Sequence, residues 1–324
     1  MASNTISEIM WPRPAVADCI FCMIVRDTRG VALDHDQRFN FFPASPVCSV
    51  TAVLAGDWHL IERPDQMDRP RSGAKMPGLS FAGAQLRPPI SWNPGETYAI
   101  MIAFYPDAFS AMTGLDLSPF TGRIVPADEV LPKPILERCR AACDAVLRDG
   151  TVSGFSALED SIETLWVAMR PVGTRPMKWT KDWSQNLAVR AARAGAGRST
   201  RQIARRIKSW TGVSERDLQG LGHSEQLYAR LHEAFQTGDV DWAGLAIASG
   251  FADQAHMIRR MRRHTGFTPE QLRQSARSAE AFWGYRLLGQ YFANPSREAA
   301  IGTALSTGSA DSETPVEDKA PPHR

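Results

Sequence analysis

The chain has 324 residues, of which 43% are hydrophobic and 22% are charged, and its formal net charge is +2. A chain of this length and composition can bury a core without disulfides and has room for two domains. No apolar run approaches the length that crosses a bilayer, so we expect no membrane partner. Five cysteines, an odd number at low density, favour a reducing cytoplasm.

The charge is distributed unevenly along the chain. Residues 1–177 hold 16 Lys and Arg against 20 Asp and Glu, a net charge of −4. Residues 178–277 hold 17 against 9, a net charge of +8, and residues 278–324 hold 4 against 6, a net charge of −2. A basic segment between two acidic ones predicts a polyanionic partner, most often nucleic acid.

The first part of the chain is predicted to be rich in β-strands. Short apolar runs at Cys19–Val25, Val47–Leu54 and Tyr98–Phe104 are separated by turn-forming clusters. Strands with this spacing, without helical patterns between them, favour a barrel or a sandwich. Pro106–Met112 fits a short helix.

Three stretches of this region are not predicted to form regular structure. Met1–Met10 lacks a cationic start followed by an apolar run, so we expect a loose terminus without a signal peptide. Glu62–Gly78 is polar and contains proline, and Leu115–Leu131 is punctuated by turn residues, so both are expected to be mostly loop.

Helical periodicity begins at Pro134. The spacing of Ile135, Cys139 and Val146 predicts one helix, and a second is expected over Phe155–Met169. Pro171–Pro176 breaks the pattern. The sequence therefore divides into a β-rich part (1–133), a helical segment with a linker (134–176), a basic helical part (177–290) and a disordered tail (291–324).

The basic part contains one pattern twice. Ile203–Ser214 recurs 54 residues later as Met257–Thr268, with an Arg-Arg pair, an apolar step of four residues and a Thr-Gly stop in the same register. A repeat of this size indicates one supersecondary unit used twice.

The second copy reads as a helix, a tight turn and a second helix. Asp241–Ser249 fits the first helix, Gly250 suits a left-handed turn, and Asp253 is a good N-cap for the next helix. This is the helix-turn-helix pattern. Met257 and Met261 would face inward, and the opposite face carries side chains suited to base edges and phosphates: Gln254, Ala255, Ile258, Arg259, Arg262 and Arg263.

The first copy has the same layout. Ser199 is the N-cap, and Ile203 and Ile207 would point inward. The outward face comprises Thr200, Arg201, Ala204 and Arg205, with Lys208 one turn further on. The preceding helix is less well supported, because Leu187–Arg193 runs into a flexible Gly-Ala-Gly sequence. A linking helix is expected over Arg216–Phe235, which would place two recognition helices in successive major-groove segments about 34 Å apart.

The segment Leu245–Pro269 closely resembles the second helix-turn-helix of AraC/XylS-type transcription regulators. The matching positions are Leu245, Ala246, Gly250, Phe251, Asp253, Gln254, His256, Arg259, Arg263, Gly266, Phe267 and Pro269. The resemblance covers roughly residues 182–275 and implies two helix-turn-helix subdomains joined by a linker helix. The chain departs from the pattern at Met257 and Met261, at Glu215, and at Ala191-Ala192-Arg193 before the first unit.

The N-terminal part resembles, more weakly, the β-barrel sensor domains of such regulators. The matching features are Gly83 and Gln85, the turn before Gly95, and Phe104, Pro106 and Ala108. This resemblance implies a cupin-like effector or dimerisation domain over residues 1–133. The expected fold class is therefore α+β with two domains, a β-rich barrel or sandwich with flanking helices followed by an all-α pair of helix-turn-helix subdomains.

Other residue patterns have simpler interpretations. The cysteines occur as two-thiol pairs without a nearby histidine, so we expect core cysteines and no metal or other cofactor. His256 and His264 are interpreted as phosphate or solvent contacts. Aromatic residues of the first part are interpreted as core in preference to the lining of an effector pocket: Phe39, Phe41, Phe42, Trp58, Phe81 and Trp92.

Together these patterns predict a cytoplasmic, sequence-specific transcription regulator that is not an enzyme. Its expected partners are double-stranded promoter DNA, a small-molecule effector, RNA polymerase and a second copy of the chain bound through the N-terminal half. One alternative is a barrel that binds or transforms a small molecule and carries a vestigial helical module. Another is a protein that binds nucleic acid without sequence preference.

Overall fold

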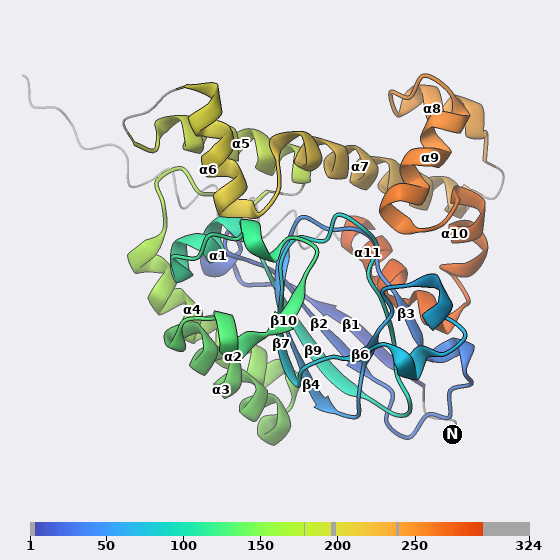
Figure 1. Cartoon of the computed structure of the whole chain (residues 1–324), viewed down its shortest axis with the longest axis horizontal. Helices are drawn as coiled ribbons and strands as arrows, with labels where there is room; N and C mark the ends of the chain where they lie inside the picture. The colour runs from blue at the N-terminus through green and yellow to red at the C-terminus, as the bar shows by residue number, and fades with distance from the viewer. Residues whose placement is uncertain (1–3, 178, 196–198, 238–239, 294–324) are drawn as a thin grey trace, which may run out of the picture.

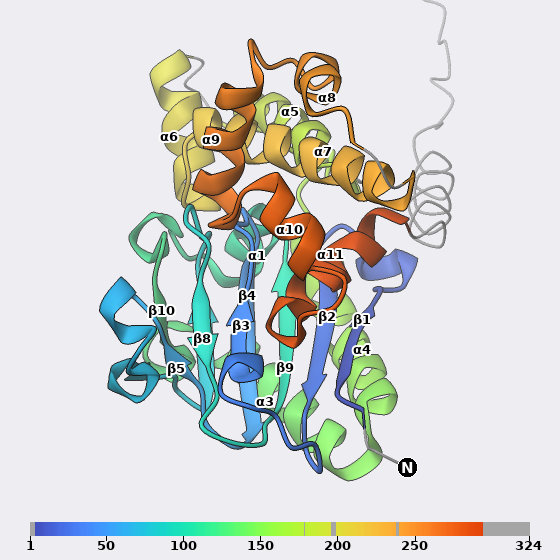
Figure 2. The same ribbon diagram turned by 90° about the vertical axis from the view of Figure 1, so that its right-hand side faces the viewer.

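The computed structural model describes residues 4–177, 179–195, 199–237 and 240–293. It has two halves, a β-rich one and a helical one that lies across one end of the first (Figures 1 and 2). The predicted α+β class is therefore confirmed. Within the described residues, none of the helices combines the length and apolar character needed to span a bilayer.

The β-rich half is built from two antiparallel sheets. The larger has the order β1 (Ile6–Met10), β2 (Ile20–Asp27), β9 (Tyr98–Phe104), β4 (Cys48–Ala55), β7 (Leu79–Ala82) and β10 (Ile124–Pro126). The smaller has the order β3 (Phe39–Phe41), β8 (Ile90–Trp92), β5 (His59–Leu60) and β6 (Ala74–Lys75). The three apolar runs of the sequence form the centre of the larger sheet.

Side chains alternate between the two faces of the larger sheet, as the period of a strand requires. On β9, Ile102 and Phe104 point to the outer face, where they join the main hydrophobic core. Met101 and Ala103 point to the inner face and line a cavity between the sheets. The outer face is covered by α1 (Pro106–Thr113), α2 (Ala127–Val130), α3 (Lys133–Asp149) and α4 (Thr151–Met169) (Figure 1).

Two sequence expectations for this half were wrong. The segment expected to be a loose terminus contains β1, which pairs with β2 from Ile6 opposite Asp27 to Met10 opposite Met23. Leu115–Leu131 contains β10 and α2. Glu62–Gly78 is mostly loop, as expected, and includes β6 and two 3₁₀ turns. The strands β1 and β10 depend on a partner strand for their hydrogen bonds, and α2 is only four residues long, so each has little signal of its own.

The helical half comprises α5 (Thr180–Arg193), α6 (Thr200–Thr211), α7 (Glu215–Thr237), α8 (Trp242–Ala248), α9 (Gln254–Thr265), α10 (Pro269–Ser275) and α11 (Trp283–Ala293). The long helix α7 crosses this half, with α6 near one end and α9 near the other (Figure 1). The expected tail 291–324 starts within α11, which continues to Ala293. Residues 294–324 lie outside the described part of the chain.

Candidate nucleic-acid interface

The two repeat copies fold into helices that begin and end in the same way. The Ser199 hydroxyl accepts a hydrogen bond from the Gln202 amide (3.3 Å) at the start of α6. The Asp253 carboxylate accepts one from the His256 amide (2.6 Å) at the start of α9. Both helices stop at a glycine, where φ is +82° at Gly212 and +80° at Gly266. Only glycine adopts this conformation without strain, so the Thr-Gly pattern acts as a stop signal.

The threonines before these glycines make matching hydrogen bonds. The Thr211 hydroxyl donates to the Ile207 carbonyl (2.7 Å) and accepts from the Val213 amide (3.2 Å). The Thr265 hydroxyl donates to the Met261 carbonyl (2.8 Å) and accepts from the Phe267 amide (3.2 Å). The repeat in the amino-acid sequence is therefore also a repeat in hydrogen-bond geometry.

The helices α6 and α9 each bury one face against the neighbouring helices. Ile207 on α6 and both Met257 and Met261 on α9 are 0% exposed, whereas Ile203 is half-buried. The side chains expected to face outward are exposed except for the half-buried Ile258: Thr200, Arg201, Ala204, Arg205, Lys208, Gln254, Ala255, Arg259, Arg262 and Arg263. Each helix thus presents a polar, basic face to solvent.

The two arginines of each pair differ in their surroundings. Arg205 and Arg259 are exposed, whereas Arg206 and Arg260 are half-buried. Arg206 donates to the Ala191 carbonyl of α5 (3.0 Å) and so connects α6 to α5. The first arginine of each pair is therefore the more accessible one to a partner on the outward face.

The supporting helix of the first unit is better formed than its sequence indicates. It begins at Thr180, before the predicted stretch Leu187–Arg193, and buries Trp183, Leu187 and Ala191. Gly195 then turns the chain with a φ of +89°. The rest of the Gly-Ala-Gly sequence lies outside the described residues.

The second unit has the predicted helix, turn and helix. The Asp241 carboxylate caps α8 by accepting from the amides of Ala243 (3.1 Å) and Gly244 (3.0 Å). Gly250 turns the chain with a φ of +78°, and Ala246 is fully buried where α8 meets α9. A small residue at this crossing allows the two helices to approach closely.

The expectation that His264 contacts phosphate or solvent was wrong. This ring is buried between α9 and α7, and its Nδ1 lies 2.6 Å from the Ser224 hydroxyl. Burial, together with the nearby Arg260 and Arg263, lowers the pKa of His264 to about 4, so the ring is neutral at physiological pH. The burial of His264 was not predicted because its neighbours in the sequence are basic.

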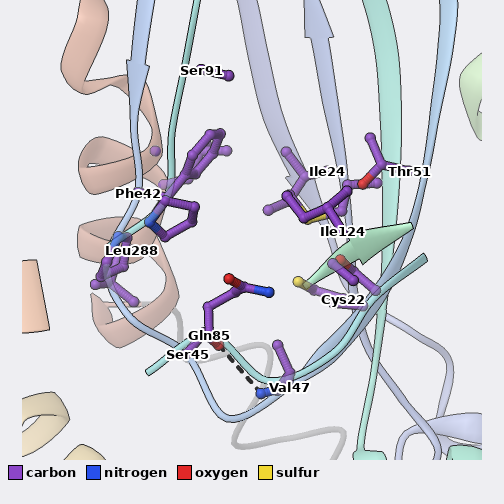
Figure 3. Close-up of a pocket in the computed structure, with 18 of the residues that line it drawn as sticks. Cys22, Ile24, Phe42, Ser45, Val47, Thr51, Gln85, Ser91, Ile124 and Leu288 are labelled. Atoms are coloured by element: carbon purple, nitrogen blue, oxygen red, sulfur yellow. Dashed lines mark hydrogen bonds between the residues drawn. The ribbon is translucent and has the colours of Figure 1, made fainter. Parts of the chain in front are cut away.

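A cavity of about 200 Å³ lies between the two sheets (Figure 3). Of the six aromatic residues weighed as pocket or core, Phe42 and Trp58 line it, while Phe39, Phe41, Phe81 and Trp92 pack in the hydrophobic core or against it. The sequence did not identify the lining of this cavity, because the lining comes from many separate segments. One of these is α11, at the far end of the chain.

The described residues contain no group of three or more His, Cys, Asp or Glu side chains placed to hold a metal ion. The cysteines contribute to the packing of the β-rich half, with Cys19, Cys48 and Cys139 fully buried. Burial raises the pKa of Cys139 to about 12 and that of Cys143 to about 11, which disfavours the reactive thiolate.

No protein-family model matches the chain, and no curated protein matches it in sequence. The structure is similar to solved structures of ToxT from Vibrio cholerae. A 1.65 Å structure of that protein is 11% identical over 73% of this chain and 94% of its own, with a TM-score of 0.34. Another, with an unsaturated fatty acid bound, is 10% identical over 84% of this chain and 97% of its own, with a TM-score of 0.33.

Proposed function

We propose that this chain is a transcription regulator of the AraC/XylS type, in which α6 and α9 read two successive major-groove segments of promoter DNA. One observation carries the proposal. Two helices with the same caps, stops and buried faces present exposed arginines near opposite ends of a single linking helix. A charged helix face that only contacts solvent would not require this repeated geometry.

The exposed side chains divide into two roles by chemistry. Arg205 and Arg259 lie in the middle of their helices, where a guanidinium can pair with the two acceptors on a guanine edge. Lys208 and Arg262 lie one turn nearer the C-terminal ends and suit phosphate contacts, which position the protein without reading sequence. The four side chains are all exposed.

The first test is a selection of bound fragments from a random DNA pool by the full-length protein. We expect a split motif with two half-sites about one helical turn apart. Enrichment of no motif, with equal affinity for random DNA at physiological salt, would favour non-specific binding and overturn the proposal.

The second test uses the selected DNA and matched variants. Arg259→Ala should weaken binding by about 1–3 kcal/mol and relax specificity at one base pair. Arg262→Ala should weaken binding to all sequences alike and reduce the salt slope by about 0.9 per lost phosphate contact. Arg140→Ala on α3 removes an exposed arginine far from both helices and serves as the control. Unchanged base preference in Arg259→Ala would show that α9 is not a reading helix.

The remaining expected partners belong to the same proposal. A homodimer through the N-terminal half would place two copies of each reading helix on the DNA, and sedimentation velocity of the full-length protein measures it. RNA polymerase contact is tested by transcription in vitro from a promoter that carries the selected site. An enzymatic barrel would instead be indicated by turnover of a small molecule that binds in the cavity.

A further inference from the structure

Helix α11 joins the cavity of the β-rich half to the second helix-turn-helix. Four of its side-chain positions, Gly284, Leu287, Leu288 and Tyr291, line the cavity. Their spacing of three and four residues places them on one face of the helix. Figure 3 shows this helix beside Phe42 and Leu288 on one side of the cavity, with the larger sheet on the other. Helix α11 thus forms one wall of the cavity.

A neighbouring face of α11 is hydrogen-bonded to α9 and to the linking helix α7. The Tyr285 hydroxyl donates to the carbonyl of Thr265, the last residue of α9 (2.8 Å). The Tyr285 carbonyl accepts from the Tyr228 hydroxyl of α7 (3.0 Å). Tyr285 is almost fully buried, so a movement of α11 has to move these partners or break their hydrogen bonds.

A second contact connects the cavity to the end of α9. The Ala44 amide donates to the His264 carbonyl (2.7 Å). The residues on either side of it, Pro43 and Ser45, line the cavity. The C-terminal end of the second reading helix therefore has hydrogen bonds to two segments of the cavity wall.

The lining of the cavity selects an uncharged ligand. It contains no Asp, Glu, Lys, Arg or His, although it includes the neutral polar residues Ser49, Thr51 and Gln85. The hydroxyls of Ser49 and Thr51 make no hydrogen bond to other described residues. The Gln85 amide donates to the Gly83 carbonyl (2.9 Å) and lies at the cavity (Figure 3). A charged ligand would lose its hydration without gaining a counter-charge, which is strongly unfavourable.

The volume sets the size of the ligand. An apolar protein cavity of about 150 Å³ holds benzene. The cavity here, at about 200 Å³, has room for one ring with a small substituent.

We propose that this cavity binds a small, uncharged molecule of about the size of one substituted ring, and that α11 transmits its binding to α9. This rests on the proposed function only in assigning α9 a role at DNA. The binding itself and the movement of α11 are independent of that role.

The test of binding uses calorimetry on the full-length protein with two single-ring probes, neutral 4-methylphenol and anionic benzoate. We expect 4-methylphenol to bind and benzoate to bind at least tenfold more weakly. Ala103→Leu, which fills the cavity from β9, should abolish binding of 4-methylphenol, whereas Ala157→Leu on the exposed side of α4 should not. Equal affinity for both probes, or binding retained in Ala103→Leu, would overturn the cavity assignment.

The test of coupling uses hydrogen exchange and needs no DNA. With 4-methylphenol at about ten times its Kd, amides of α11 and the C-terminal turn of α9 should exchange about tenfold more slowly. In Tyr285→Phe, which loses only the hydroxyl bonded to Thr265, α11 should remain protected while the effect on α9 declines. Protection confined to the sheets in the wild-type protein would refute the role of α11. A protein that passes these tests and selects no DNA motif would lose the proposed function but keep the ligand site.

Discussion

The buried ion pair between Asp107 and Arg190 provides a sharp test of how the two halves are held together. Asp107 lies in the first turn of α1 in the β-rich half, and Arg190 lies on α5, the supporting helix of the first reading unit. Their side chains are 2% and 8% exposed. Asp107 also accepts a hydrogen bond from the Trp183 indole (2.9 Å). Removing Arg190 would leave this carboxylate buried with a single neutral donor.

Breaking a buried pair in this way costs about 3–5 kcal/mol, because the remaining charge is uncompensated. We therefore expect Arg190→Met to destabilise the docking of α5 by about two to three and a half decades in equilibrium constant, at about 1.4 kcal/mol per decade. The double variant Asp107→Asn with Arg190→Met removes both charges. It should recover most of the loss, since neither charge remains buried.

Native-state hydrogen exchange of α5 and α6 measures this effect locally, which matters because a two-part chain need not unfold in one step. The chain supplies a matched control in Asp18, which accepts from the Trp166 indole (2.8 Å) and pairs with Arg170 (3.0 Å). Arg170 is 39% exposed, so water can take its place and Arg170→Met should cost about 1 kcal/mol or less. Equal costs for the two arginine variants, or no recovery in the double variant, would refute the reasoning.

Three further outcomes follow from local features. The pKa of His264 is lowered to about 4, so between pH 6.5 and 4 the unfolded chain binds a proton that the folded chain does not. The free energy of unfolding should therefore fall as pH drops through this window, by up to about 1.4 kcal/mol per pH unit. In urea titrations, His264→Gln should reduce this dependence on pH. Asp253→Ala should cost about 1 kcal/mol by removing the cap of α9, and Ser199→Ala should have a similar effect on α6, both measured by hydrogen exchange. Gly154→Ala should lower the thermal midpoint by an amount equivalent to about 1–3 kcal/mol, because its Cβ would lie 2.4 Å from Val146 Cγ2.

The helix-turn-helix repeat was predictable because its signals are local. Ser199 and Asp253 cap helices through bonds to residues three positions away, and Gly212 and Gly266 stop them through their own backbone conformation. Such signals do not depend on the rest of the fold. The central strands were predictable for the same reason, because their apolar runs are long enough to be recognised without knowledge of the partner strands.

Features that depend on distant partners were missed. The strand Ile6–Met10 is an edge strand of ordinary composition, and only its pairing with β2 reveals it. His264 lies in a basic stretch of sequence, yet its burial depends on Ser224 of another helix. The cavity requires residues from both sheets and α11 to converge. In each case the deciding contact joins residues that no periodicity relates.

The C-terminal ends of α6 and α9 both contact the β-rich half, but through different residues. At the end of α6, the Thr121 hydroxyl donates to the Gly212 carbonyl (2.5 Å) and the Leu117 amide donates to the Ser209 carbonyl (2.8 Å). Neither donor lines the cavity. At the end of α9, the Ala44 amide of the β-rich half donates to the His264 carbonyl, and the Tyr285 hydroxyl of α11 donates to the Thr265 carbonyl. Both donors adjoin residues that line the cavity.

Under the proposed function, this asymmetry determines how a ligand in the cavity would act on DNA binding. The separation of α6 and α9 depends on α7 and on both anchors, and DNA requires that separation to match one helical turn. A ligand in the cavity would bear on the α9 anchors and leave the α6 anchors in place. The first unit then provides a fixed reference on the DNA, while the second moves into or out of register. An effector that acts in this way changes affinity for paired half-sites more than affinity for a single half-site.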